Sequence, residues 1–265
     1  MHLAAAAAPV AVGGRQIASH DLQIRSVPAR TVPHDLSDSM IALAGRSLPG
    51  LDAGAYVRAR LACYERALVA TAAGRITAFV LVDDAHEVRG AQLVYVGPLF
   101  SERSAYLPLF VALVRELLAR RRPFHVLAEV QCPKIVLAFE QLFWRSALPR
   151  LDGSAVPDDA RVVARAFARS ISHMGALDEQ RMATRADGGT TLYVPRPGYE
   201  PVTSWLERRG VVLARGDSQL LLVSCLGTRA ERARLSLEMS AGAAALRDYA
   251  SAKRRMLARF EGGAR

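Results

Sequence analysis

The sequence of 265 residues contains no apolar run close to the ~20 residues that a membrane-spanning helix needs. It has three cysteines, Cys63, Cys132 and Cys225, which are far apart in the chain. This number and spacing argue against a disulfide framework and favour a reducing compartment, so a cytoplasmic location is expected. The sequence has no CxxC or HxxxH pair, so no metal site is expected.

Lysine is almost missing, and the formal net charge of +10 comes almost wholly from arginine. One interpretation is the codon bias of a GC-rich bacterial genome, which would carry no functional meaning. The other is an anionic partner, namely nucleic acid, a phosphorylated cofactor or an acidic carrier protein. No platform of interleaved aromatic and basic residues is present, so nucleic acid is the less favoured partner.

Composition divides the chain into three parts. Residues 1–20 are rich in alanine, without a basic segment before them, and are expected to form a flexible tail. Residues 21–225 are expected to form one α/β domain, with an insertion at about 145–190 that carries a single helix. Residues 226–265 are rich in alanine and arginine and are expected to form a helical C-terminal extension.

Hydrophobic periodicity predicts the elements of the central domain. Alternating or continuous apolar runs predict strands at 22–32, 66–74, 75–85, 91–97, 124–131 and 190–194. Helical spacing predicts helices at 34–48, 55–69, 106–122, 134–144 and 200–209. Gly216-Asp217 predicts a closing hairpin over 211–225, and Gly97-Pro98 is expected to end the strand that begins at 91.

The end of that strand reads "VYVGP", with Val96, Gly97 and Pro98 in a V-x-P pattern. This pattern and the order of elements resemble the GNAT superfamily of N-acetyltransferases over residues 22–145 and 190–225. The resemblance implies an α/β (α+β) fold with a central mixed, mainly antiparallel sheet flanked by helices. It also implies that the backbone near Val96 and Gly97 binds the pantetheine arm of an acyl donor.

The loop that follows has none of the glycines with which this superfamily holds the pyrophosphate of coenzyme A. Ser101 stands at the Gln/Arg position, Glu102 and Ser104 at the first two glycine positions, and Tyr106 at the last. The amides of a loop at a helix N-terminus still favour an anion. Carried over by position, the donor-binding residues are Val96, Gly97, Ser101, Arg103, Ser104 and Ala105.

The glycine-free loop resembles a branch of the superfamily that takes its acyl chain from an acyl carrier protein and makes N-acyl amino acids or acyl-homoserine lactones. Such a donor presents phosphopantetheine without a pyrophosphate. Carrier proteins are acidic, so a basic surface would favour docking. The implied co-substrate is an acyl-phosphopantetheine thioester, on an acyl carrier protein or on coenzyme A, with no tightly bound cofactor.

Two residues are candidates for proton transfer. Glu129 lies in the strand "FHVLAEVQ" and is a candidate general base toward an amine; the alternative is a solvent-facing or ion-paired glutamate. The superfamily often uses a tyrosine as general acid, but the two aligned positions are Phe139 and Trp205. Tyr199, or Tyr193, would then supply the acid.

Three functions are therefore compared. The first is an acyltransferase that moves an acyl group from a phosphopantetheine thioester to the amine of a small molecule or amino acid. The second is a catalytically silent GNAT-like module with a binding or regulatory role, which the absent glycines and tyrosine support. The third is a nucleic-acid-associated basic protein, for which net charge is the only support.

Overall fold

The computed structural model describes residues 22–48, 50–102, 106–143, 146–171, 176–185, 197–214, 216–245 and 249–262. The tail predicted at 1–20 and the strand predicted at 190–194 lie outside these residues. Within the described part of the chain, no helix combines the length and the apolar character required to cross a membrane.

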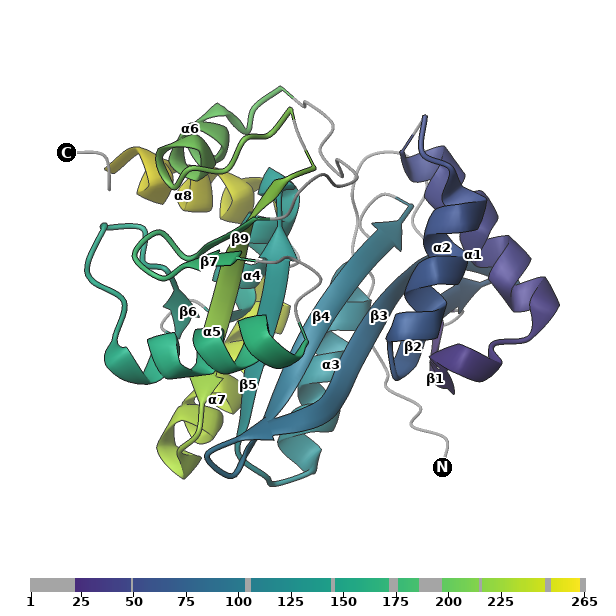
Figure 1. The fold of residues 1–265 in the computed structure, drawn as a ribbon, viewed down its shortest axis with the longest axis horizontal. Coiled ribbons are helices and arrows are strands. Elements are labelled where there is room, and N and C mark those ends of the chain that lie inside the picture. Colours follow the sequence, from purple (N-terminus) through teal and green to yellow (C-terminus); the bar gives the residue numbers. More distant parts are fainter. Residues whose placement is uncertain are drawn as a thin grey trace.

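The described strands form one sheet, in the order β1-β2-β3-β4-β5-β9-β8-β7, with β6 paired to β9 beside this path (Figure 1). Every pair is antiparallel except β4–β5, which is parallel. The strands are β1 (Gln23–Pro28), β2 (Arg66–Ala72), β3 (Arg75–Val88), β4 (Ala91–Ser101), β5 (Phe124–Val130), β6 (Ala147–Leu148), β7 (Ala176–Asp178), β8 (Ala183–Arg185) and β9 (Ser218–Leu226).

Helices cover both faces of this sheet. The described helices are α1 (His34–Ser47), α2 (Ala53–Cys63), α3 (Tyr106–Ala119), α4 (Pro133–Phe143), α5 (Asp158–Ser170), α6 (Glu200–Arg208), α7 (Arg229–Ala245) and α8 (Tyr249–Gly262), with a short 3₁₀ turn η2 (Ala29–Thr31). Helices α1, α2 and α5 pack on one face, and α3, α4, α6, α7 and α8 pack on the other. The predicted fold class, a mixed and mainly antiparallel sheet flanked by helices, is confirmed.

Strand β4 shows why the two faces differ. Val94 and Val96 point into the core under α3 and α4, whereas Leu93 and Tyr95 point into the core under α1, α2 and α5. A strand covered by helices on both faces is apolar along its length. Because successive side chains point to opposite faces of the sheet, neighbouring residues of β4 join different cores.

The expectation that Gly97-Pro98 ends β4 is wrong, because the strand continues to Ser101. The pairing with β3 shifts at this point, from Val82 opposite Val96 to Val80 opposite Leu99. A bulge tolerates a residue without a backbone N–H, so the proline interrupts the ladder without ending the strand.

The hairpin predicted over 211–225 is also wrong. Within the described residues 211–214 and 216–217 there is no strand, and Val212 N–H donates instead to the Ser218 hydroxyl at 2.7 Å. The free edge of β9 is occupied by β8 and β6, which come from the segment 145–190. That segment was expected to carry a single helix, whereas it contributes β6, β7 and β8 as well as α5, which packs against Tyr95 through Phe167.

Glu140 is a buried carboxyl group on α4, only 2% exposed. Burial raises its pKa to about 7, although the charges of Arg259 and Arg150 oppose this shift. The folded-state pKa therefore exceeds the ordinary value of 4.5, and the unfolded chain binds fewer protons than the folded chain between these two pH values. Stability is expected to fall as the pH rises through this window, by about 3 kcal/mol at 1.36 kcal/mol per pKa unit.

Glu140→Gln should remove this pH dependence because the amide is neutral throughout. We expect the variant to match the wild type near pH 5 and to be more stable at pH 8, in urea denaturation at four pH values. Glu207→Gln, on an exposed position of α6, is the matched control and should leave the wild-type curve unchanged. Parallel curves for Glu140→Gln and the wild type would contradict the assignment.

Candidate active site

The two parallel central strands separate at a defined position. Pairing between β4 and β5 runs from Gln92 opposite Phe124 to Tyr95 opposite Leu127, and no later pair is formed. Both strands continue beyond this point, β4 to Ser101 and β5 to Val130. Backbone groups at the diverging ends are therefore available to a ligand, beside Val96 and Gly97, where the resemblance implies that the donor binds.

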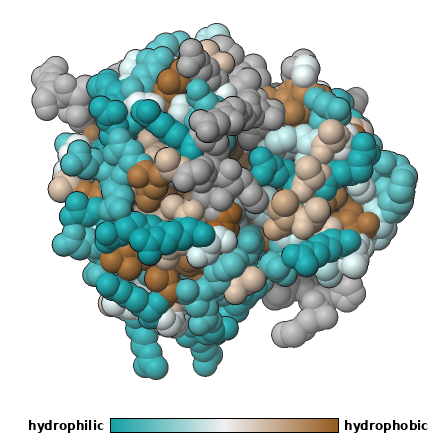
Figure 2. Space-filling view, in the orientation of Figure 1, coloured by the Kyte–Doolittle hydropathy of each residue, from teal (hydrophilic) through white to brown (hydrophobic). Residues whose placement is uncertain are grey.

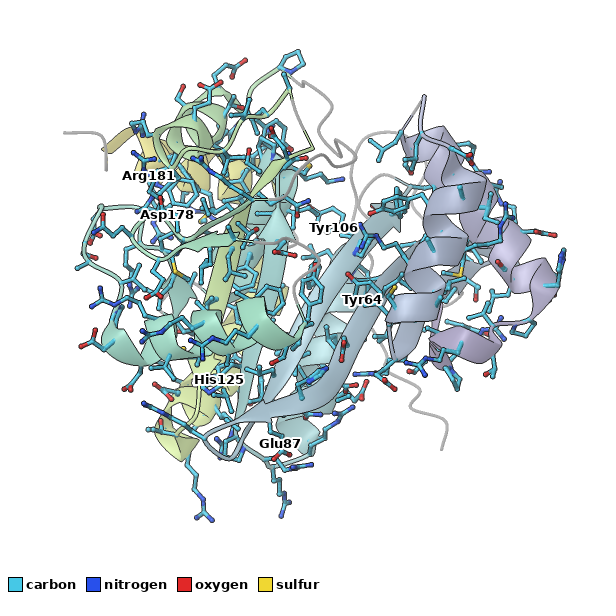
Figure 3. All side chains as sticks on the ribbon, in the orientation of Figure 1. Tyr64, Glu87, Tyr106, His125, Asp178 and Arg181 are labelled. Atoms are coloured by element: carbon cyan, nitrogen blue, oxygen red, sulfur yellow. The ribbon has the colours of Figure 1, made fainter. Side chains whose placement is uncertain are left out.

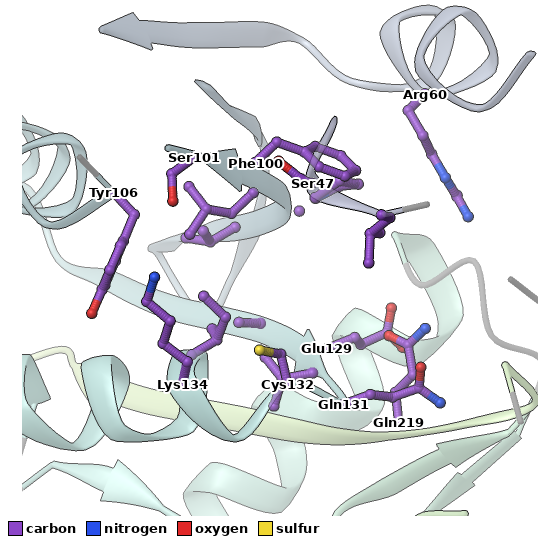
Figure 4. Close-up of a pocket in the computed structure, with 18 of the residues that line it drawn as sticks. Ser47, Arg60, Phe100, Ser101, Tyr106, Glu129, Gln131, Cys132, Lys134 and Gln219 are labelled. Carbon is purple, nitrogen blue, oxygen red and sulfur yellow. The ribbon is translucent and has the colours of Figure 1, made fainter. Parts of the chain in front are cut away.

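A cavity of about 160 Å³ occupies this position (Figure 4). Its walls come from the diverging ends of β4 and β5, from α1 and α2, from the start of α3 and α4, and from β9. The lining residues are Ser47, Leu48, Tyr56, Arg60, Tyr64, Tyr95, Val96, Gly97, Pro98, Leu99, Phe100, Ser101, Tyr106, Phe110, Ala128, Glu129, Val130, Gln131, Cys132, Lys134, Ile135 and Gln219.

A chain of hydroxyl groups ends on the carboxylate of Glu129. The Tyr95 hydroxyl donates to Glu129 Oε2 at 2.9 Å, and the hydroxyls of Tyr64 and Tyr95 are hydrogen-bonded to each other. The two tyrosine rings stack with their centroids 5.6 Å apart. Tyr64 follows α2, so these hydrogen bonds connect the end of α2 to Tyr95 on β4 and to Glu129 on β5.

The electrostatics of this chain keep the tyrosines protonated. Burial, followed by the negative charge of Glu129, raises the pKa of Tyr95 well above its ordinary value. Burial also raises the pKa of Tyr64. Both phenols are therefore hydrogen-bond donors at neutral pH, and Glu129 is the only carboxylate among the described residues that line the cavity.

Gly97 is required by this arrangement for a steric reason. A Cβ atom added at residue 97 would overlap the ring and the hydroxyl of Tyr64. The absence of a side chain at Gly97 therefore allows the tyrosine to lie directly against β4, beside the place where the two strands diverge.

The other wall of the cavity carries a cation. The ammonium of Lys134, at the start of α4, lies 4.3 Å from the centre of the Tyr106 ring, at the start of α3. Glu102, which precedes the glycine-free loop, is bound by Arg46 at 3.0 Å and by Arg75 at 3.6 Å. The negative charge that stands at a family glycine position is thus neutralised by two arginines.

Comparisons with known proteins find similarity only among solved structures. No family model matches the chain, and no curated protein matches it. Among solved structures, it is similar to the aminoglycoside N-acetyltransferase AAC(6')-Iy in complex with CoA, with 17% identity and a TM-score of 0.30, over 41% of this chain and 76% of that chain. It is also similar to a ribosomal-protein-alanine N-acetyltransferase from Brucella melitensis biovar Abortus 2308, with 19% identity and a TM-score of 0.29, over 38% and 74%.

A third similar structure comes from Desulfovibrio desulfuricans and is described as an acetyltransferase of the GNAT family. It has 9% identity and a TM-score of 0.36, and the match covers 77% of this chain and 99% of that chain. The mixed sheet of this chain, with β4 and β5 separating after Tyr95, agrees with the GNAT-like fold expected from the sequence.

Some of the predicted site residues line the cavity, and others lie outside the described residues. Glu129, Val96, Gly97 and Ser101 all line the cavity, and so does Cys132. The other predicted loop residues, Arg103, Ser104 and Ala105, lie outside the described residues, as does Tyr193.

The described residues that were considered for the general acid are outside the cavity lining. Tyr199 precedes α6, with the ammonium of Lys253 at 3.8 Å from its ring centre. Phe139 and Trp205, at the two positions aligned with the family tyrosine, are buried against Phe143 and Phe260 respectively. Tyr64 and Tyr106 lie instead in the central part of the molecule (Figure 3).

Sequence patterns did not identify Tyr64, Tyr95 or Arg60, although all three line the cavity. For Tyr95 a signal exists, because it alternates with Val94 and Val96 and must face the same side of the sheet as Glu129. Tyr64 and Arg60 have no comparable signal, since the packing of α2 on the sheet determines where they point. Within the described residues, no group of three or more His, Cys, Asp or Glu side chains is arranged to hold a metal ion.

Because a Cβ atom at residue 97 would overlap Tyr64, Gly97→Ala should disrupt the cavity. We expect displacement of the Tyr64 ring, a loss of stability of about 1–3 kcal/mol from overpacking, and at least a tenfold loss of any activity that uses the cavity. Denaturation and activity measurements check this. Gly45→Ala is the matched control, because its Cβ would meet only Ala53 at an ordinary 3.6 Å. If the clash is the cause, Gly97→Ala combined with Tyr64→Ala should be no worse than Tyr64→Ala alone.

Proposed function

We propose that this chain is an N-acyltransferase that moves an acyl group from a phosphopantetheine thioester to an amine. The observation that carries the proposal is the cavity between the diverging ends of β4 and β5, with Glu129 held on one wall by Tyr95. The cavity combines unpaired strand backbone, a carboxylate and aromatic walls, which suit an amide-rich arm, an amine and an acyl chain respectively.

The donor enters between the two strands. Backbone groups of residues 96–98 bind the amides of the pantetheine arm, in the manner of an added strand. The aromatic side chains of Phe100, Tyr106 and Phe110 line the cavity and offer an apolar surface to the acyl chain. Lys134, together with the amides of the loop after Ser101, attracts the phosphate at the far end of the arm.

The reaction then proceeds by attack of the amine on the thioester carbonyl carbon. Glu129 accepts a proton from the amine, the N–C bond forms, and the C–S bond breaks. The electron pair of that bond leaves on sulfur, and the thiolate takes the proton back from Glu129, so that the products are an amide and a free thiol. Holding both reactants in one cavity supplies the proximity part of the acceleration.

The acyl group is proposed to arrive on an acyl carrier protein. A loop without glycine offers little close backbone approach to a pyrophosphate, whereas a carrier protein presents a single phosphate. A net charge of +10 also favours association with an acidic carrier. We therefore expect acyl carrier protein to be a better donor than coenzyme A with the same acyl chain.

The decisive experiment measures thiol release from acyl-acyl-carrier protein and, separately, from acyl-coenzyme A, with a panel of amines and amino acids. Release that depends on both donor and acceptor supports acyl transfer. Release from neither donor favours the silent GNAT-like module, and a steep salt dependence of binding to random DNA would favour the nucleic-acid alternative.

Labelling of Cys132 tests donor binding without catalysis. Cys132 lines the cavity, and burial raises the pKa of Cys225 to about 12, so that Cys225 is a thiol with little reactivity. In a Cys63→Ser background, a bound donor should protect Cys132 from alkylation. Labelling at an unchanged rate under saturating donor would place the donor elsewhere.

A further inference from the structure

Arg60 is a cation in the wall of the cavity that the proposed transfer step does not use. It lies on α2, is half-buried, and extends toward the side of the cavity where Glu129, Gln131 and Gln219 lie (Figure 4). Its guanidinium carbon is 5.3 Å from the centre of the Tyr56 ring.

Among the described residues, the tyrosines beside Arg60 carry no compensating charge at neutral pH. Desolvation lowers the pKa of Arg60. Tyr56, Tyr64 and Tyr95 raise it by more, so the pKa of Arg60 lies above its ordinary value. Yet burial raises the pKa of each of these tyrosines, so they are neutral phenols. None of the ion pairs formed between described residues includes Arg60.

A partly desolvated cation without an anion is unfavourable, unless a ligand supplies the anion. The guanidinium group has a planar fork of donors that matches a carboxylate in a two-point contact. Glu129, which faces the same cavity, accepts a hydrogen bond and then the proton from a neutral amine. The two side chains of opposite charge thus come from α2 and β5 and border one space of small-molecule size.

We infer that the acceptor is an amine that also carries a carboxylate, such as an α-amino acid, and that Arg60 binds this carboxylate while Glu129 receives the amine. The inference rests on the proposed acyl transfer and names the substrate class of the same site. The side-chain amide of Gln219, which lines the cavity, provides a neutral hydrogen-bonding group for the rest of the acceptor.

The positions of the two cations, Lys134 and Arg60, also separate the donor from the acceptor. Lys134 and Tyr106 form the wall at the start of α3 and α4, where the donor phosphate is expected, whereas Arg60 approaches from α2. A role of Arg60 in binding the acceptor therefore predicts an effect on the acceptor KM and none on the donor KM.

The test uses the common amino acids, each paired with its neutral α-amide, in the thiol-release reaction and in isothermal titration calorimetry. For the wild type we expect at least one amino acid to be preferred over its amide by about 10- to 100-fold, the size of a charge-assisted hydrogen-bonded contact. Arg60→Gln should remove this preference and raise the acceptor KM by the same factor, with an unchanged donor KM. Arg60→Lys, which keeps the charge and loses the fork, should fall between the two.

Arg58→Gln is the matched control, because Arg58 is exposed on the same helix and is not in the cavity lining. Amides that equal their amino acids in the wild type, or a preference that survives in Arg60→Gln, would overturn the inference. Discrimination in calorimetry without thiol release would overturn the proposed transfer and keep the carboxylate site. Neither turnover nor binding with any amino acid would overturn both.

Discussion

Glu129→Gln is expected to lower kcat/KM for acyl transfer by about 10²- to 10⁴-fold, the usual contribution of a positioned general base. The amide has the same shape as the carboxylate, and its oxygen still accepts the hydrogen bond from Tyr95 that measures 2.9 Å in the wild type. It cannot take a proton from the amine at neutral pH. The loss should therefore appear in steady-state kinetics, while urea denaturation and donor protection of Cys132 remain close to those of the wild type.

The matched control for this substitution is Glu65→Gln, an exposed glutamate that precedes β2 and pairs only distantly with Arg30 at 4.0 Å. It should keep full activity. Tyr95→Phe is a second, informative variant, since it leaves Glu129 in place without its hydroxyl donor and should have a smaller effect. Activity of Glu129→Gln within threefold of the wild type would show that another group removes the proton.

Asp84→Asn is expected to destabilise the fold by about 3–5 kcal/mol, the cost of leaving buried charges without their partner. Asp84 Oδ2 accepts hydrogen bonds from Arg66 at 3.1 Å and from Arg120 at 2.8 Å, and the side chains of Asp84 and Arg66 are only 12% exposed. Both arginines also contact Glu116 on α3. Without Asp84, two cations share a single carboxylate, at the junction of β2, β3 and α3.

Equilibrium urea denaturation measures this effect. Glu87→Gln is the matched control, because Glu87 lies on the same strand but pairs with Arg122 at the surface, where both side chains are at least half exposed. An exposed pair contributes less than about 1 kcal/mol. Equal changes for the two variants would mean that burial of the Asp84 cluster has no energetic role.

Alternation of apolar residues was sufficient to predict most strands of the central sheet and the amphipathic helices around it. It failed where strand pairing depends on distant residues. The segment before Ser218 looks like the first arm of a hairpin, but the edge of β9 is filled by β8 and β6. Pro98 likewise suggested a strand end, and a register shift against β3 accommodates it within β4.

For the candidate site, local patterns predicted Glu129 and the V-x-P motif of Val96 and Gly97, which line the cavity, because strand alternation and a short motif are local properties. They did not indicate that Glu102 would be neutralised by Arg46 and Arg75, which are 56 and 27 residues away in the chain. Long-range ion pairs of this kind depend on how α1 and β3 approach the loop.

The sequence alone thus determined a large α/β core, a V-x-P motif with a glycine-free loop after it, and an acidic residue on a strand. Folding established the site itself, by bringing Tyr64 and Arg60 of the α2 region against Gly97 and Tyr95 of β4 and Glu129 of β5. The physical reason is that strand and helix periods report which face a residue occupies, whereas its partners across the cavity follow from packing between elements far apart in sequence.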